Sequence, residues 1–143
     1  MNREILFRAK HIHAIPGNEH LNGTWVHGYL SDKDYIYDKS LEGEFLVDEN
    51  TICQYSGRTD KNKKKIFEGD VVKDSAGVCG VVKFGLYTAG FSIPDTNQGF
   101  YIEFPEESLY RKELGYWENK VIVIGNIYDN PELLEEENVH GTD

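Results

Sequence analysis

Short runs of alternating apolar and polar residues, separated by turn residues, repeat along most of the chain. Residues 11–15 alternate and are followed by a Pro-Gly pair, and an Asn-Gly pair at 22–23 precedes the aromatic run 25–30. Alternation with a period of two predicts half-buried strands, and Asn-Gly is a favoured centre of a tight hairpin turn. Further short apolar runs follow at 35–37 and 41–47. Residues 1–56 are therefore predicted to form a β-meander.

The stretch EGDVVKDSAGVCGVVKFG, residues 68–85, predicts a β-hairpin with a Gly-containing connection. Gly69 lets the chain turn sharply, Asp70 is placed to accept backbone N–H groups in that turn, and two valines then enter the sheet. This kind of phrase is common where small SH3-like barrels begin. We predict an SH3-like β-barrel over residues 57–134 and an acidic tail over 135–143. The alternative is one continuous structural unit.

The composition supports a mainly β class. Of the 143 residues, 39% are apolar and 13% aromatic, with a single Met. Tyr, Phe, Val and Ile suit pleated, half-buried strands. The predicted fold class is all-β, or mainly β: an N-terminal β-meander plus a C-terminal SH3-like barrel. At most one or two short helices are expected, and residues 105–112 are a candidate.

Charge and apolar run lengths restrict the partners and the compartment. The formal net charge of -10 argues against a broad surface for nucleic acid phosphates. The sequence has no apolar run near the roughly 18 residues that a membrane-spanning helix needs, and its first residues are too charged for a secretory signal. We expect a soluble, cytoplasmic protein with no membrane partner. Cys53 and Cys79 form no CxxC pair and are expected to be reduced, buried thiols.

The histidines are the weak candidates for a metal site. His11 and His13 are two positions apart and would share one face of a strand, where His20 or His27 could approach them through the first hairpin. The sequence offers no third ligand at a diagnostic spacing, so no metal and no other cofactor is predicted. It also lacks a nucleophile elbow, a phosphate-binding GxxxxGK[ST] loop and an HExxH motif. We therefore expect no enzyme and no catalytic residues.

One dense basic run is the candidate interaction loop. It lies between two predicted strands and consists of Arg58, Lys61, Lys63, Lys64 and Lys65. Tyr55 precedes it and Phe67 follows it, so one hypothesis is a small-barrel nucleic acid binder in which lysines contact phosphates while aromatic rings stack on bases. The alternative, which we favour, is a solvated hairpin tip.

The aromatic residues are too many for one small core. Tyr and Trp are enriched where protein meets protein, so some of them are expected at a surface. The candidate surface aromatics are Tyr55, Phe67, Tyr116 and Trp117, within a larger set that includes Trp25, Tyr29, Tyr35, Tyr37, Tyr87, Tyr101, Tyr110 and Tyr128. The leading prediction is a non-enzymatic protein-interaction module that docks to another protein or associates with itself.

Three phrases in a fixed order resemble a known family. They are NREILFRAK with GTWVHGYL, residues 2–10 and 23–30; QYSGRTDKN leading into EGDVV, residues 54–62 and 68–72; and VIGNIYDNPELL, residues 123–134. Together they resemble the YopX family of small proteins encoded by bacteriophages and prophages of Gram-positive bacteria. The resemblance implies a mainly β accessory protein with a C-terminal SH3-like barrel, made in the bacterial host cytoplasm from a phage or prophage gene. The partner of the predicted interaction module is then expected to be a host or phage protein. It implies no catalytic residue and no cofactor.

This chain departs from the family pattern at one position. Where the family typically reads Asp-Lys-Asn-Gly, residues 60–63 read Asp-Lys-Asn-Lys. Losing that Gly disfavours a two-residue type I′ turn, because both central residues of that turn need a positive φ. Asn62 is then the candidate for a left-handed conformation in this turn, because Asn tolerates it better than most residues.

Overall fold

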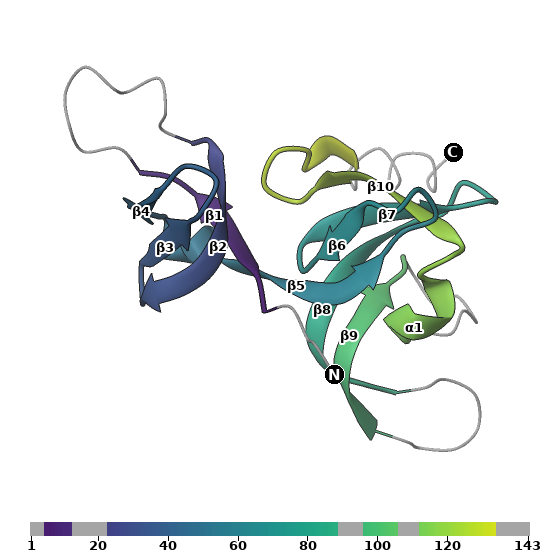
Figure 1. Cartoon of the computed structure of the whole chain (residues 1–143). Helices are drawn as coiled ribbons and strands as arrows, with labels where there is room; N and C mark the ends of the chain where they lie inside the picture. Colours follow the sequence, from purple (N-terminus) through teal and green to yellow (C-terminus); the bar gives the residue numbers. More distant parts are fainter. Residues whose placement is uncertain (1–4, 13–22, 89–95, 106–111, 134–143) are drawn as a thin grey trace. The chain divides into compact units, whose positions relative to one another are not determined.

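The computed structural model describes residues 5–12, 23–88, 96–105 and 112–133, and it is mainly β (Figure 1). The chain divides into two compact units, Met1–Tyr55 and Ser56–Asp143. All registered strand pairs among the described residues are antiparallel. The predicted all-β class is thus confirmed. Whether each unit folds alone, as a division into domains implies, stays a prediction.

The first unit is an antiparallel sheet with strand order β4-β3-β2-β1-β5. A 3-10 helix, η2, covers Glu49–Thr51 and leads into β5. The Asp48 carboxylate caps the N-terminus of η2 by accepting the Asn50 amide. The strands are β1 (Phe7–Lys10), β2 (Trp25–Asp32), β3 (Tyr35–Asp38), β4 (Gly43–Leu46) and the start of β5 (Cys53–Thr59). The meander predicted from the alternating pattern is therefore present as β1 to β4.

The sheet of the first unit closes on itself beyond the end of β1. His11 bridges to Val47, its amide donates to the Thr24 carbonyl at 2.8 Å, and the Ile12 amide donates to the Leu46 carbonyl at 2.9 Å. The residues after β1 thus join both ends of the four-strand meander, which protects the main-chain groups of the outer strand. The enclosed core consists of Ala9, Val26, Ile36 and Val47, with Phe7, Phe45 and Ile52 packed against it.

The second unit contains a four-stranded antiparallel sheet of order β10-β7-β8-β9. Its last strand returns to pair with β7 after a short helix, and a register shift between Val123 and Gly125 bends it. The elements are β6 (Lys65–Phe67), β7 (Asp70–Asp74), β8 (Cys79–Thr88), β9 (Thr96–Glu103), α1 (Leu114–Trp117) and β10 (Val121–Asn126). This strand order does not by itself establish an SH3-like barrel, which stays a prediction.

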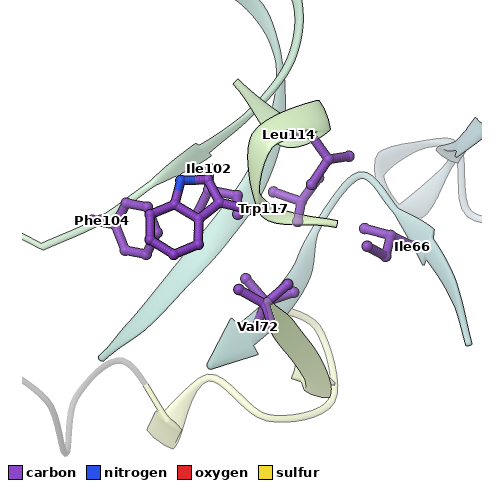
Figure 2. Close-up of a cluster of buried hydrophobic side chains, with 8 residues drawn as sticks. Ile66, Val72, Ile102, Phe104, Leu114 and Trp117 are labelled. Atoms are coloured by element: carbon purple, nitrogen blue, oxygen red, sulfur yellow. The ribbon is translucent and has the colours of Figure 1, made fainter. Parts of the chain in front are cut away.

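The core of the second unit is a single apolar cluster, and α1 supplies its largest side chain (Figure 2). The Trp117 ring lies 5.2 Å from the Phe104 ring, centroid to centroid. Gly80 on β8 makes this packing possible, because a Cβ at that position would lie 2.5 Å from the Ile102 side chain. The cluster consists of Ile66, Val72, Val82, Ile102, Phe104, Leu114, Trp117 and Val121.

The remaining expectations about the scaffold have mixed outcomes. The one α-helix with described bounds is Leu114–Trp117, whereas the expected helix at 105–112 falls mostly on residues 106–111, outside the described ranges. Cys53 and Cys79 are both buried and form no disulfide, as predicted. Among the described residues, no helix is both long enough and apolar enough to cross a bilayer.

Candidate functional site

The basic loop between β5 and β6 is organised by one buried carboxylate. Asp60 is 3% exposed. Its Oδ1 accepts hydrogen bonds from the amides of Asn62 and Lys64 at 2.8 and 2.9 Å, and its Oδ2 accepts one from the Val123 amide at 2.9 Å. The Lys61 amide donates to the Val121 carbonyl at 3.0 Å. The loop is therefore fixed to β10, and this leaves its lysine side chains at the surface.

The loop turns at Lys63. This residue has φ of 71°, in the left-handed region, whereas Asn62 is not among the residues with positive φ. The expectation that Asn62 would take the left-handed conformation was wrong. The Asp60 carboxylate accepts the amides on both sides of Lys63, so the turn geometry places the positive φ at the position where the family pattern has Gly.

The structure separates Arg58 from the lysines of the predicted interaction loop. Arg58 Nη1 donates to Glu118 Oε1 at 2.9 Å, and its guanidinium lies over Gly115, where an added Cβ would be 3.2 Å from the guanidinium carbon. Arg58 thus ties the end of β5 to α1 and the residue after it. The other four members, Lys61, Lys63, Lys64 and Lys65, have exposed side chains.

Three of the four candidate surface aromatics are buried. Tyr55 is 8% exposed, Phe67 4% and Trp117 9%, so the prediction that they lie at a surface was wrong. Alternation along β5 turns Tyr55 inward, β6 is buried at both Ile66 and Phe67, and Trp117 packs into the core. Tyr116 is exposed, with the Lys120 ammonium 4.3 Å from its ring centroid. Tyr55 and Phe67 therefore cannot offer ring faces to nucleic acid bases.

The predicted histidine set is not brought together by the described residues. His11 is buried, its Nδ1 donates to the Leu46 carbonyl at 2.8 Å, and the ring lies edge-on to Phe45. His27 is exposed on β2. His13 and His20 lie outside the described residues. Within the part of the chain that the structure describes, no group of three His, Cys, Asp or Glu side chains is placed to hold a metal ion.

A surface groove of about 360 Å³ lies on the first unit. Tyr29 on β2 and Tyr37 on β3 are cross-strand partners whose rings stack at a centroid distance of 5.4 Å. Tyr29 is 56% exposed. We call this site the tyrosine groove; its described lining residues are Ile5, Leu6, His27, Gly28, Tyr29, Tyr37, Asp38, Lys39 and Ser40.

The floor of the tyrosine groove requires a glycine. A Cβ at position 28 would lie 1.8 Å from the Tyr37 carbonyl oxygen, so only Gly28 allows β2 and β3 to approach so closely. Beside it, the buried Asp38 carboxylate is fully engaged: Oδ2 accepts the His27 amide at 2.9 Å, and Oδ1 accepts the amide and the hydroxyl of Ser40 at 3.0 and 2.6 Å.

The pKa values of two groups in the groove, Asp38 and His27, are both lowered, but for different reasons. Burial acts to raise the pKa of Asp38, but the Ser40 hydroxyl and the backbone amides outweigh it and hold that pKa below its ordinary value. Partial shielding from water lowers the pKa of His27, the Arg8 cation lowers it further, and Asp38 opposes both. At neutral pH the groove therefore holds a hydrogen-bonded carboxylate and a neutral imidazole, beside apolar walls.

Sequence reasoning placed Tyr29 and Tyr37 among the surplus aromatics but not in a site. The signal that could have found them is the pairing of two tyrosines across a short hairpin, whose turn lies at residues 33–34. What the sequence did not indicate is that Ile5 and Leu6 form the facing wall.

A second group of exposed apolar side chains lies on the β8–β9 hairpin. Phe84 is 47% and Leu86 69% exposed, and the Phe84 ring packs on Phe100 at 4.9 Å. On the alternate positions, Tyr87 stacks on Tyr101 at 5.1 Å. Burial raises the pKa of Tyr87, Glu113 adds to the increase, and Arg58 opposes it.

The phrases of the family resemblance build turns rather than a reactive centre. In the third phrase, Asn126 Oδ1 accepts the amides of Tyr128 and Asp129 at 2.9 and 2.8 Å, and a Cβ on Gly125 would lie 2.5 Å from Asn130 Oδ1. In the second, Asp70 Oδ2 accepts the Phe67 amide at 2.8 Å across the left-handed Gly69. These residues specify the fold.

Two comparisons with known proteins bear on the family of the chain. A search of the curated proteins found no match. The model of the family described as YopX protein matches residues 15–135, a range that begins before β2 and extends past β10. The match covers far more than half of the chain and includes two of the three phrases in full. The chain therefore belongs to the YopX family.

Proposed function

We propose that the chain is a phage or prophage accessory protein that acts in the bacterial host cytoplasm as a non-enzymatic protein-interaction module. The observation that carries the proposal is the tyrosine groove, where an exposed tyrosine stacks on a second one beside an open apolar hollow of about 360 Å³. Tyr side chains supply a large rigid contact area at low entropic cost, and they are enriched among residues that dominate interface energies. Membership of the YopX family supports the phage-type origin.

The state of the groove's polar groups supports binding rather than catalysis. A general base needs an accessible lone pair aimed at a substrate proton. Both Asp38 oxygens already accept hydrogen bonds from the protein, and the His27 backbone, not its ring, is the group that Asp38 contacts. The Asp38 carboxylate therefore has a structural role: it holds β3 to the His27 amide of β2 and fixes Ser40 after the strand. The apolar walls and the tyrosine rings remain as the contact surface.

The second candidate function is nucleic acid binding through the basic loop. The specific observation in its favour is the presentation of four exposed lysines, Lys61, Lys63, Lys64 and Lys65, on a loop that Asp60 holds in one conformation. If four lysines contact phosphates, raising the salt concentration from 50 to 200 mM should lower the affinity roughly 100-fold. The burial of Tyr55 and Phe67 and the net charge of -10 weigh against it, so it ranks second.

A comparison of variants in host lysate separates the two functions. The tagged wild-type chain, Tyr29→Ala, Tyr35→Ala and the triple variant Lys63→Glu/Lys64→Glu/Lys65→Glu are each used for capture, with and without nuclease. Tyr35 is the matched control, because it is an exposed tyrosine of β3 that does not line the groove. A stoichiometric protein that survives nuclease, is lost with Tyr29→Ala and is kept with Tyr35→Ala supports the interaction module. Retention that depends on the three lysines and disappears with nuclease establishes the second candidate.

A further inference from the structure

The tyrosine groove lies where β2 extends past the end of β1. The registered pairing of β1 with β2 ends at Phe7 opposite Gly28, whereas β2 continues to Asp32. Over residues 29–32, the only registered strand partner of β2 within the described ranges is β3. Before Phe7, the Leu6 carbonyl accepts the Tyr55 amide at 2.8 Å, which continues the pairing of β1 with β5. Ile5 and Leu6 line the groove together with Tyr29, the first residue of the extended part of β2.

An extended strand with one partner is a template for main-chain pairing. A segment of another protein can add to such an edge, with backbone hydrogen bonds giving affinity and pockets for alternate side chains giving specificity. Here the whole overhang is exposed, including Tyr29 at 56% and Leu30 at 37%. The register shift between Leu30 and Asp32 bends the strand, which restricts an added segment to a few residues.

The groove defines which side chain an added segment would place beside this edge. Its walls are apolar at Ile5 and Leu6, and Ile5 is 64% exposed. Asp38, the one carboxylate among the described lining residues, is occupied by three donors from His27 and Ser40. A basic side chain would lose water there without gaining an ionic partner, so the groove suits a large apolar or aromatic side chain better.

Charge selects a partner rather than a second copy of the chain. Each copy carries a net charge of -10, so pairing two copies at this edge brings like charges together. Among the described residues of the first unit, exposed carboxylates also outnumber exposed cations, with Asp32, Glu42, Glu44 and Glu49 against Lys33 and Lys39. A segment with Lys or Arg beside its apolar residues is attracted by the same field.

We propose that the overhang of β2 at residues 29–32 receives an extended segment of a partner protein as an added strand, with an apolar side chain in the tyrosine groove and basic residues flanking it. This inference rests on the proposed function and specifies its mode of recognition. Binding then uses two kinds of contact: main-chain hydrogen bonds along β2, and burial of the exposed Tyr29 ring and Ile5 side chain against the inserted residue.

A peptide-display selection tests this mode directly. A library of random 12-residue peptides is selected on the immobilised full chain, in parallel on wild type, Tyr29→Ala and the control Tyr35→Ala. The strongest Tyr29-dependent peptide is then synthesised with a single N-methyl group on each backbone amide in turn, which removes one donor without changing the side chains. We expect peptides with apolar residues at alternate positions and flanking Lys or Arg, at least tenfold weaker binding to Tyr29→Ala, and losses of about tenfold for N-methyl groups at alternate amides only.

The outcomes distinguish this inference from the proposed function. Tyr29-dependent peptides that tolerate N-methylation everywhere, or that are rich in proline, would leave the groove as an interaction site and overturn strand addition. Selection of peptides that bind wild type and Tyr29→Ala equally, or of none, would overturn both. Alternating losses upon N-methylation, together with protection of the amides of residues 30–32 from hydrogen exchange, would establish the added strand.

Discussion

Replacing Asp60 by alanine should destabilise the second unit far more than a single loop substitution normally does. The Asp60 carboxylate accepts three backbone amides, those of Asn62, Lys64 and Val123, while being 3% exposed itself. A hydrogen bond to a charged group contributes about 1.5–3 kcal/mol. The amides of the two loop residues regain water when the loop opens, so the main cost comes from the Val123 amide and from the freed loop. We expect a loss of about 3 kcal/mol in the free energy of unfolding.

A matched control is provided by the tip of the β7–β8 hairpin. Asp74 Oδ1 accepts the amides of Ala76 and Val78, both at 2.9 Å, but this turn is largely accessible to water. Asp74→Ala should therefore cost only about 1 kcal/mol, because water replaces the carboxylate. Comparing the two variants isolates the effect of burial from the effect of losing a side-chain acceptor in a turn.

Urea unfolding followed by tryptophan fluorescence measures both losses. The chain has two tryptophans, so a Trp25→Phe background leaves Trp117, in the core of the second unit, as the reporter. The reasoning would be refuted by an Asp60→Ala variant that stays within 1 kcal/mol of its background, or by one that loses no more stability than Asp74→Ala.

Three further perturbations have defined outcomes. Lys63→Gly should stabilise the second unit by about 0.5–1 kcal/mol, since Gly tolerates the φ of 71° that costs an L-residue about 1 kcal/mol, and Lys61→Gly should not, both measured as shifts in the urea midpoint. Gly80→Ala should cost about 1–3 kcal/mol through the 2.5 Å approach to the Ile102 Cγ2 methyl, and Ile102→Leu in the same chain, which removes that methyl, should restore part of the loss if the clash is the cause. Because the pKa of Asp38 is lowered in the folded state, its contribution to stability is present above its ordinary pKa and is lost as the pH falls through about 4 and below. The midpoint reported by Trp25 should accordingly fall less between pH 6 and pH 3 in Asp38→Asn than in wild type; equal falls would contradict this assignment.

The sequence was a good guide wherever a local pattern decides the conformation. Alternation located the strands, and Gly69-Asp70 was correctly read as a turn in which Asp70 accepts a backbone amide. Local pattern failed where distant residues decide. The Arg58 partner, Glu118, is 60 positions away, and the Val123 amide that holds Asp60 is 63 positions away. No periodicity indicates such pairs.

The candidate site shows the same limit. Composition indicated a surplus of aromatic side chains, but it could not tell which of them the sheets bury. Tyr55 and Phe67 were chosen for their nearness to the lysines, yet their strands turn them inward. The tyrosine groove depends on Ile5 and Leu6 lying near Tyr29 and Tyr37, and only the assembled sheet reveals that arrangement.

The closure of the first unit has a consequence during synthesis on the ribosome. The Lys10 amide finds its acceptor, the Thr51 hydroxyl, 41 positions further along the chain. At about 5–20 residues per second, a ribosome needs roughly 2–8 s to add that stretch. Throughout this interval the emerged β1 can pair with β2 on one side only, and its other edge is open to neighbouring nascent chains on the same message. Slowing translation while residues 30–50 emerge from the ribosome should therefore lower the soluble yield of the protein, whereas the same delay placed after the whole first unit has emerged should spare this unit.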